Sequence, residues 1–339
     1  MSEPRPTGPS DRSQAPPADV RGLAQARAAA RAARDWPQAD RLRGEIEAAG
    51  WKVIDSGLDF RLEPSHPSDV VEGGRVRYGS SAAVPSRLED PVTVPATVVL
   101  VAPEWPQDLR RAMAGLQAYA PRDTQVVLVG DDPSPDTASL LETIEADAGA
   151  ASEPRPGPEV VWTSARLGQA AALNAGLRRA LGRAAIVLDT SVEPTGDFVT
   201  PLVEALDDPD VAVAGGWGIV SADLRHFEAA PAGDVDAIEG YCLAFRRADY
   251  AARGPLDEHF RFYRNLDIWW SLTLRDEGPG ATPRRAVALA GLPLQRHEHR
   301  GWESLPEADR DRLSKRNFYR VLDRFRDRRD LLVRRDVPG

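Results

Sequence analysis

Cysteine is almost absent from this chain: Cys242 is the only one among 339 residues. A single thiol cannot form an intrachain disulfide, and it cannot build a cysteine-ligated zinc or iron–sulfur site. Because such sparse cysteine is typical of a reducing compartment, we expect a cytoplasmic protein.

Long apolar runs are missing as well. No stretch approaches the roughly 18 apolar residues that a membrane-spanning helix needs. The first twenty residues, MSEPRPTGPSDRSQAPPADV, also lack the apolar core of a signal peptide. The sequence therefore predicts neither a transmembrane segment nor export.

Lysine is nearly as rare as cysteine. Lys52 and Lys315 are the only lysines, so arginine makes up almost all of the 43 basic residues, and 52 acidic residues leave a formal net charge of −9. Affinity for nucleic acid depends largely on a basic surface that neutralises phosphates. Since Asp and Glu alternate with arginine in the basic C-terminal residues, we expect no nucleic-acid partner.

Two glycine-rich phosphate-binding motifs are also absent. Neither GxGxxG nor GxxxxGK[ST] follows the first apolar run of the main domain, where VAPEWPQD stands instead. The sequence thus gives no support for backbone cradling of a pyrophosphate, as in dehydrogenases or P-loop ATPases. A bound nucleotide would have to be held in another way.

What the chain does contain divides it into five parts. Residues 1–20 are rich in Pro, Ser and charge, which predicts a disordered tail. Residues 21–64 predict a small helix-hairpin module, with two short helices followed by two alternating strands. Residues 65–95 contain several prolines and predict a linker lying against a domain surface. The main domain is expected over residues 96–300, and one amphipathic helix over 301–339.

The main domain alternates short β-branched apolar runs with helical patterns. Strands alternating with helices at this spacing predict an α/β fold, with a mainly parallel sheet covered by helices on both faces. The predicted strands are 96–102, 125–129, 159–162, 185–188 and 211–214, and the predicted helices are 109–119, 137–146, 169–181 and 198–206.

Acidic side chains close two of these strands. Asp131 and Asp132 follow the second run, and Asp189 follows the fourth. Ligands of open α/β sheets bind at the carboxyl ends of the strands, where a carboxylate needs a partner such as a cation or a ribose hydroxyl. Helix N-capping is the alternative, and it suits Asp131 and Asp132 better than Asp189.

Four segments, in the right order, resemble family 2 glycosyltransferases of the GT-A fold over roughly residues 95–300. LVGDDPSPD is similar to the family's VVDNGSTD, SARLGQAAALNAGLRRALG to its NxGxAxARNxGLxxAxG, and LDTSVEPTGDF to its DxD strand end. EGYCLAFRR with GPLDEHFRFYRNLDIWWSLTLRDEG is similar to its GxxxxxRR and EDxDLxxRLRxxG region. The resemblance implies a Rossmann-like GT-A domain. It also implies transfer of a sugar from a nucleotide-sugar donor to an acceptor hydroxyl, normally with inversion.

The resemblance also assigns roles to individual residues. Asp267 would be the general base that deprotonates the acceptor, the alternative being a helix N-cap before IWWSLTLRDEG. A divalent cation, Mn²⁺ or Mg²⁺, would be held by Asp189, with Glu193, His297 and His299 as further candidate ligands. The donor nucleotide would contact Asp131, Asp132, Asn174, Asp189 and Ser191, and the acceptor would contact Glu239, Tyr241 and Trp269.

Several departures from the family pattern leave alternatives open. Ser191 replaces the second aspartate of DxD, and Leu266 replaces the glutamate before the catalytic aspartate, so a metal requirement is in question. The same departures motivate a second interpretation, a catalytically inactive protein that binds nucleotide sugars. Aromatic residues such as Trp269 are alternatively core residues.

The two ends of the chain suggest further hypotheses. ARDWPQADRLRGEIEAAGWKVIDSGLDFRLEP resembles the short C-terminal appendage of cysteinyl-tRNA synthetases, which makes an RNA-associated protein a third, weaker interpretation. A module reused for packing explains the same residues. In the C-terminal helix, a basic face beside Phe and Leu would suit a lipid-linked acceptor at the inner membrane face, and a polysaccharide acceptor is equally open. Packing on the main domain is the simpler role.

Overall fold

The computed structural model describes residues 15–56, 59–102, 104–150 and 157–333. The chain divides into two compact units, Met1–Ser68 and Asp69–Gly339. Most of the tail expected at residues 1–20 lies outside the described residues. Its last residues belong to a helix, because Val20 is buried in the core of the first unit.

The first unit is a pair of helices with an antiparallel hairpin. Helix α1 spans Ala18–Ala32 and α2 spans Trp36–Ala48, while β1 (Trp51–Ser56) pairs with β2 (Asp59–Pro64). Asp35 caps α2 by accepting a hydrogen bond from the Gln38 N–H at 3.2 Å. Val20, Ala24, Ile46 and Trp51 form a small core of its own.

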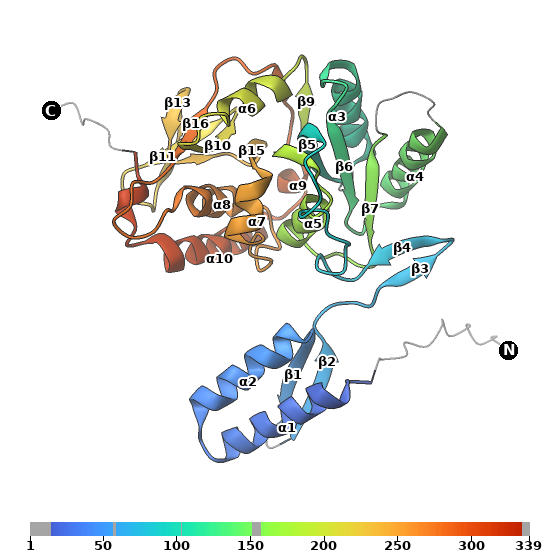
Figure 1. Cartoon of the computed structure of the whole chain (residues 1–339), viewed down its shortest axis with the longest axis vertical. Coiled ribbons are helices and arrows are strands. Elements are labelled where there is room, and N and C mark those ends of the chain that lie inside the picture. The colour runs from blue at the N-terminus through green and yellow to red at the C-terminus, as the bar shows by residue number, and fades with distance from the viewer. Residues whose placement is uncertain (1–14, 57–58, 103, 151–156, 334–339) are drawn as a thin grey trace. The chain divides into compact units, whose positions relative to one another are not determined.

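The second unit is built on a ten-stranded sheet with the order β13-β16-β10-β15-β8-β5-β6-β7-β4-β3 (Figure 1). The neighbours β8, β5, β6, β7 and β4 run parallel, while β15 and the two edge strands β13 and β3 run antiparallel to their partners. The strands are β3 Val70–Glu72, β4 Arg75–Tyr78, β5 Val94–Ala102, β6 Gln125–Gly130, β7 Glu159–Thr163, β8 Gly182–Leu188, β10 Val211–Gly215, β13 Gly233–Val235, β15 Cys242–Arg246 and β16 Arg285–Ala288.

Helices cover both faces of this sheet. Val99 and Val127 pack with α5 and α8 on one face, whereas Val98 and Leu128 pack with α3 and α6 on the other. The predicted α/β fold is thereby confirmed. The helices are α3 Pro106–Tyr119, α4 Pro135–Ala150, α5 Gln169–Leu177, α6 Val199–Ala205, α7 Arg247–Arg253, α8 Leu266–Arg275, α9 Arg300–Glu303 and α10 Glu307–Phe325.

The stretch expected as a linker, residues 65–95, contains two strands of the main sheet. Strand β4 joins the parallel edge of β7, with Arg77 opposite Trp162, and β3 forms a hairpin with β4. The linker expectation therefore needs correcting. The sequence shows little sign of these strands because they are held by backbone pairing at the edge of the sheet. Their side chains do not form a buried apolar face, since Val70 and Val71 are exposed.

Shorter strands stand beside the main sheet. A small antiparallel sheet has the order β12-β11-β14, and β9 pairs with β17. These elements are β9 Val192–Pro194, β11 Gly218–Ser221, β12 Phe227–Ala230, β14 Ala237–Ile238 and β17 Leu294–Arg296.

The C-terminal residues pack on this second unit. Helix α10 buries Val321 and Phe325, and Asn317 Nδ2 donates to two backbone carbonyls of the loop before α8. Beyond it, Arg328 meets Asp276 at 2.7 Å, at the end of α8. These contacts support the packing role for the C-terminal helix, which begins at Glu307.

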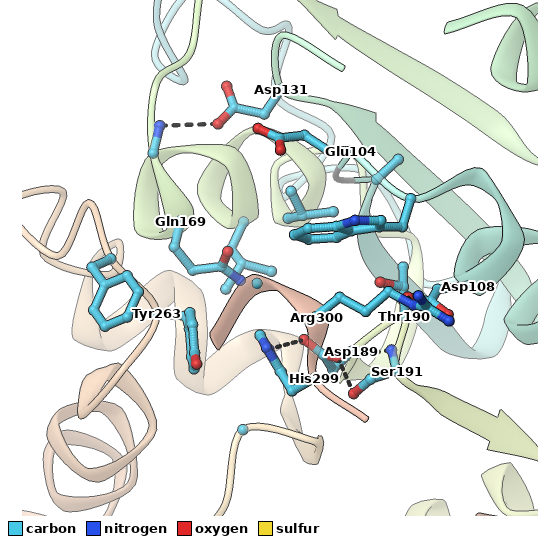
Figure 2. A pocket seen from close by; sticks show the side chains of 18 of the residues that line it. Glu104, Asp108, Asp131, Gln169, Asp189, Thr190, Ser191, Tyr263, His299 and Arg300 are labelled. Carbon is cyan, nitrogen blue, oxygen red and sulfur yellow. Dashed lines mark hydrogen bonds and ion pairs between the residues drawn. The ribbon is translucent and has the colours of Figure 1, made fainter. Parts of the chain in front are cut away.

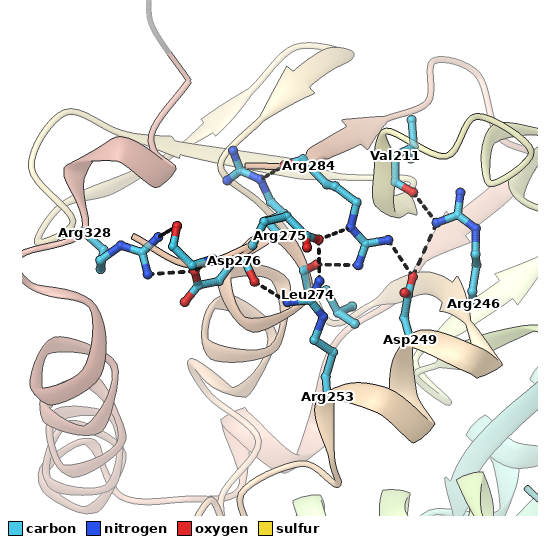
Figure 3. A network of polar contacts seen from close by, with 11 residues as sticks. Val211, Arg246, Asp249, Arg253, Leu274, Arg275, Asp276, Arg284 and Arg328 are labelled. Atoms are coloured by element: carbon cyan, nitrogen blue, oxygen red, sulfur yellow. Dashed lines mark hydrogen bonds and ion pairs between the residues drawn. The ribbon is translucent and has the colours of Figure 1, made fainter. Parts of the chain in front are cut away.

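A polar network completes this side of the unit. Figure 3 shows Arg284 reaching both the Asp249 carboxylate on α7 and the Leu274 carbonyl on α8, each at 2.9 Å. Buried and half-buried arginines thus join α7, α8 and the residues at the start of β16 by donating to carbonyls as well as carboxylates. Within the described residues, no helix is long and apolar enough to cross a membrane.

Candidate active site

Two cavities open at the carboxyl ends of the central strands and share one wall. The first cavity, of about 310 Å³, contains Asp131, Asp189 and Ser191 in its lining. The second cavity, of about 400 Å³, is lined by Asp267 and Glu239 among others. The side chains or backbone that border both are Gln169, Leu173, Val187, Asp189, Gly240, Tyr263 and His299.

Asp189 is the polar centre of the shared wall (Figure 2). Its Oδ1 accepts hydrogen bonds from the Ser191 N–H at 2.8 Å and from the Ser191 hydroxyl, and its Oδ2 lies 3.4 Å from His299 Nε2. Burial alone would raise the pKa of Asp189, but His299 and Ser191 outweigh it and hold that pKa below the ordinary value. The carboxylate therefore stays charged at the end of β8.

His299, which follows the last strand of the chain, completes this arrangement. Its ring stacks on Tyr263 with centroids 4.4 Å apart, and its Nδ1 accepts the Trp302 N–H at 3.2 Å. Burial disfavours the imidazolium, yet the Asp189 carboxylate more than offsets this, so the pKa of His299 is raised. Asp189 and His299 form a preorganised pair facing both cavities.

Asp131 holds the chain before α5. Its carboxylate accepts the N–H groups of Leu167 at 2.7 Å and Gly168 at 3.0 Å, while Thr163 donates at 3.2 Å. Burial, the largest influence, raises the pKa of Asp131 in spite of these bonds. Asp131 thus lines the first cavity and also fixes one of its walls.

Asp132 lies elsewhere. It is exposed, borders neither the first nor the second cavity, and has a left-handed backbone with φ 52°. It does not cap α4 either, since the Ser134 hydroxyl accepts the Thr137 N–H there. The structure therefore separates Asp132 from the donor residues predicted beside it.

Asp267 stands on the far side of the second cavity, in the first turn of α8. Its Oδ2 accepts the Gly240 N–H and its Oδ1 accepts the Ile268 N–H, both at 2.9 Å. Asn265, not Asp267, is the N-cap residue of α8. Burial raises the pKa of Asp267 above that of an ordinary aspartate, although the two N–H groups oppose the shift.

Glu239 and Tyr241, which were predicted to contact the acceptor, also line the second cavity. Glu239 Oε2 lies 3.3 Å from Arg296, and burial raises the pKa of Glu239. The Arg296 guanidinium lies 4.9 Å from the centres of both the Tyr241 and Trp217 rings. Stacking on Arg296 therefore helps to fix the positions of the Tyr241 and Trp217 rings.

Trp269 does not reach either of these cavities. It is 7% exposed and packs against Phe260 and the Arg324 guanidinium. The neighbouring Trp270 lines the second cavity instead. Trp269 is therefore a core residue, which was the alternative to a contact with the acceptor.

The four candidate metal ligands separate into two pairs. Glu193 and His297 face each other at 2.7 Å across the β9–β17 pair and line neither cavity. In the described residues no three His, Cys, Asp or Glu side chains converge as a metal centre. Asp189 and His299 are therefore the pair that fits a cation, with the Ser191 hydroxyl as a neutral oxygen beside them.

Asn174, expected to contact the donor, is a structural residue. Its Oδ1 accepts from Tyr250 OH at 3.0 Å and from the Leu256 N–H at 2.9 Å, and its Nδ2 donates to the Leu256 carbonyl and to Glu258. All the hydrogen-bonding capacity of the amide is used in holding the loop after α7. The side chain is 1% exposed and borders neither cavity.

Several lining residues were not predicted from the sequence. Tyr263 borders both cavities, and the buried Asp108 borders the first, where it lies 3.2 Å from Arg300. Arg166 contacts Glu104 at 2.8 Å near Asp131. Nothing in the α3 pattern distinguishes Asp108 from a surface acid.

Residues 97–269, just over half of the chain, match the family model described as Glycosyl transferase family 2. The resemblance drawn from the four sequence segments is therefore confirmed.

The chain is also similar to solved structures, and the first of them, with a TM-score above 0.5, agrees with the α/β fold. The crystal structure of GalNAc-T7 with UDP, GalNAc and Mn²⁺ has a TM-score of 0.57 and 16% identity, covering 70% of this chain and 50% of that one. The mannosyltransferase PcManGT from Pyrobaculum calidifontis, in complex with GDP-Man and Mn²⁺, gives 0.48 and 19%, covering 66% of this chain and 64% of its own. The chain thus spans about half to two thirds of the length of these relatives.

A short match concerns the N-terminal module. A cysteine–tRNA ligase of Opitutus terrae (strain DSM 11246 / JCM 15787 / PB90-1) is 49% identical over 49 residues, which is 14% of this chain and 11% of the ligase. A match of this length reflects a shared module and does not carry over the activity of the ligase.

Proposed function

Because the chain belongs to the family 2 glycosyl transferases, we propose that it transfers a sugar from a nucleotide-sugar donor to an acceptor hydroxyl, with inversion at the transferred carbon. The observation that carries this proposal is the common wall of the two cavities. A donor in the first cavity and an acceptor in the second would meet at Asp189, Gly240 and His299.

The donor occupies the first cavity in this proposal. Asp131 and the segment that it fixes before α5 face the nucleoside, and Asp189 and Ser191 lie toward the diphosphate. Arg300 supplies positive charge to the departing diphosphate. Asp189 and His299 would hold the divalent cation, whose chemistry is to neutralise charge on that leaving group. The Mn²⁺ in the structure of GalNAc-T7 supports this part by analogy of fold.

The acceptor occupies the second cavity, where Asp267 acts as the general base. As the acceptor oxygen bonds to the anomeric carbon, its proton passes to the Asp267 carboxylate and the bond to the diphosphate oxygen breaks. The N–H groups of Gly240 and Ile268 hold the carboxylate in place. Attack from the side opposite the leaving group gives inversion in one displacement.

A donor panel tests the proposal. UDP-, GDP- and TDP-sugars are screened by thermal shift with and without Mn²⁺, because a ligand that binds the native state raises its stability. Transfer is then measured for the wild type, Asp267→Asn, and Asp323→Asn as a control on the exposed side of α10. Asp267→Asn should reduce transfer by roughly 100-fold or more while the donor still binds.

The opposite results are equally clear. Transfer near the wild-type rate in a folded Asp267→Asn protein would remove Asp267 as the base. Donor binding without transfer in the wild type, across donors and acceptors, would favour the inactive nucleotide-sugar-binding protein.

A further inference from the structure

A third cavity, of about 560 Å³, adjoins the second one beyond Asp267. It lies between the β11–β12 hairpin, the start of α8 and the middle of α10. Glu239, Arg264, Asp267 and Trp302 border both the second and the third cavity. A molecule whose hydroxyl reaches Asp267 from this direction would therefore place its remaining atoms in the third cavity.

Three cationic side chains from three different elements line this cavity. Arg225 comes from the β11–β12 turn, Arg264 from the residues before α8, and Lys315 from α10. Lys315 is one of only two lysines in the chain. Among the described residues, no ion pair involves any of the three, although most arginines of the second unit contact a carboxylate or a carbonyl. None of these three cations therefore has an ion-pair partner in the described residues, although the Arg264 charge also acts on Glu239 and Asp267.

The acidic side chains of the same cavity do not balance that charge. Glu239 is already paired with Arg296, and Asp267 is held by two backbone N–H groups for its proposed catalytic role. Asp311, which is exposed on α10, is the third carboxylate of the lining. Three unpaired cations therefore face one uncommitted carboxylate.

Trp302 organises the cationic side of the cavity. The Arg264 guanidinium lies 5.3 Å and that of Arg310 lies 5.0 Å from the centre of the Trp302 ring. A stacked guanidinium keeps its N–H edge available and loses little further freedom when it binds an oxyanion. Because these groups already engage the ring, Trp302 is a poor platform for stacking a sugar.

Polar and apolar groups complete the lining. The Ser314 hydroxyl is buried without a hydrogen-bond partner, and so is the Nε of Arg310 close by. Unsatisfied buried donors of this kind are uncommon in folded proteins. Ile219, Phe227 and Phe318 supply an apolar flank.

We propose that this third cavity is the subsite for an oxyanion carried by the acceptor, a phosphate ester in the first instance, with an apolar portion of the acceptor against Phe227 and Phe318. The inference rests on the proposed transfer reaction, since it is Asp267 that places the acceptor here. A guanidinium fork from Arg264 and the ammonium of Lys315 would neutralise the phosphate, and Arg225 would close the site from the hairpin.

Binding of phosphate probes by the full-length protein tests this subsite. Calorimetry at low salt compares octyl phosphate, glycerol phosphate and the uncharged octyl glucoside, using wild type, the double variant Arg225→Ala/Lys315→Ala, and the control Arg316→Ala. Arg316 is the exposed neighbour of Lys315 on α10 and borders none of the three cavities. All three substituted side chains are exposed, so the variants should fold normally.

Octyl phosphate should bind the wild type and Arg316→Ala alike, and should bind the double variant at least about tenfold more weakly. Equal binding of octyl phosphate to wild type and double variant, or equal binding of octyl glucoside and octyl phosphate, would overturn the proposal. Glycerol phosphate binding as tightly as octyl phosphate, and weakened in the double variant, would support the oxyanion subsite and point to a water-soluble acceptor. Tighter octyl phosphate would point to a lipid-linked one.

Failure of this inference can be told apart from failure of the transfer proposal. Hydrolysis of the nucleotide sugar by water needs the donor in the first cavity but no acceptor, so it is measured in the wild type and in the control Arg316→Ala, whose rates should be equal. A protein that binds and hydrolyses a donor yet shows no charge-dependent phosphate binding would refute the subsite alone.

Discussion

His299 Nε2 lies 3.4 Å from Asp189 Oδ2, so a histidine after the last strand of the fold meets the carboxylate that closes β8. Burial would by itself neutralise both groups, and their proximity keeps the carboxylate charged and the imidazole basic. A second acid–histidine pair, Glu193 on β9 and His297 directly after β17, lies outside both cavities. The chain thus contains its own control for the role of the first pair.

The first prediction compares these two pairs. Asp189→Ala and His299→Ala should each weaken nucleotide-diphosphate binding in the presence of Mn²⁺ by about tenfold or more, since a buried charged contact is lost. Glu193→Gln and His297→Ala should leave that affinity within about twofold, because neither residue lines a cavity. Calorimetry on the four variants decides the matter, and equal losses from both pairs would contradict the assignment.

A second prediction concerns Ser191, which donates two hydrogen bonds to Asp189. In Ser191→Asp a second carboxylate replaces the donor hydroxyl, so the metal-free variant should be less stable than wild type by roughly 1–3 kcal/mol. Mn²⁺ should then raise the melting temperature of the variant more than that of wild type, because a cation relieves the repulsion between the carboxylates. An unchanged Mn²⁺ response in thermal melts would argue against a cation beside Asp189.

A third prediction distinguishes structural from ligand-binding roles at Asn174. Asn174→Ala should lower the free energy of unfolding by about 2–4 kcal/mol, because Tyr250 OH and the Leu256 backbone lose buried partners. Nucleotide affinity, measured well below the melting temperature, should stay near that of wild type. Urea denaturation and calorimetry check the two parts separately. A large loss of affinity without loss of stability would restore the donor-binding role expected from the sequence.

The sequence predicted the fold well because local patterns determine it. The β-branched runs that form β5, β6 and β8 are unambiguous, and the strand ends bring Asp131 and Asp189 to one edge of the sheet. The strands β3 and β4 were not predicted because they form by pairing with the backbone at the edge of β7, and no pattern of side chains in the sequence indicates such pairing.

The residues of the site could be predicted only where a family motif implied that two segments distant in the sequence lie close together. The resemblance to the family brought His299 to Asp189, but it gave His297 the same standing. What separates the two histidines is the register of β9 with β17, which sets Arg296 opposite Val192 and directs His297 to Glu193. For Asn174, the match to a sequence motif cannot show that all four hydrogen bonds of the side-chain amide are made within the fold. Contacts of this kind join distant segments and need the assembled structure.

The last prediction concerns the pH dependence that Asp267 imposes. Burial raises its pKa, while the N–H groups of Gly240 and Ile268 and the nearby Arg264 cation oppose the shift. A general base works only when ionised, so kcat should fall as the pH decreases through this raised pKa, at a higher pH than an ordinary aspartate would give. Glu239 faces the same cavity and has a raised pKa of its own, so the profile is also measured in Glu239→Gln, where the acid limb due to Asp267 should persist.

Stability should move in the opposite direction to activity. An acid whose pKa is raised by folding stabilises the protein in its protonated form, so this contribution is complete below the pKa of the unfolded chain. It is lost as the pH rises through the folded pKa. At neutral pH the buried carboxylate therefore lowers stability, and Asp267→Asn, which removes the charge, should unfold at an equal or higher urea concentration than wild type while transfer collapses. The two measurements together identify a carboxylate kept for catalysis. An Asp267→Asn protein that is clearly less stable than wild type at neutral pH, or that retains the acid limb in kcat, would show that Asp267 serves the fold and that another group takes the proton.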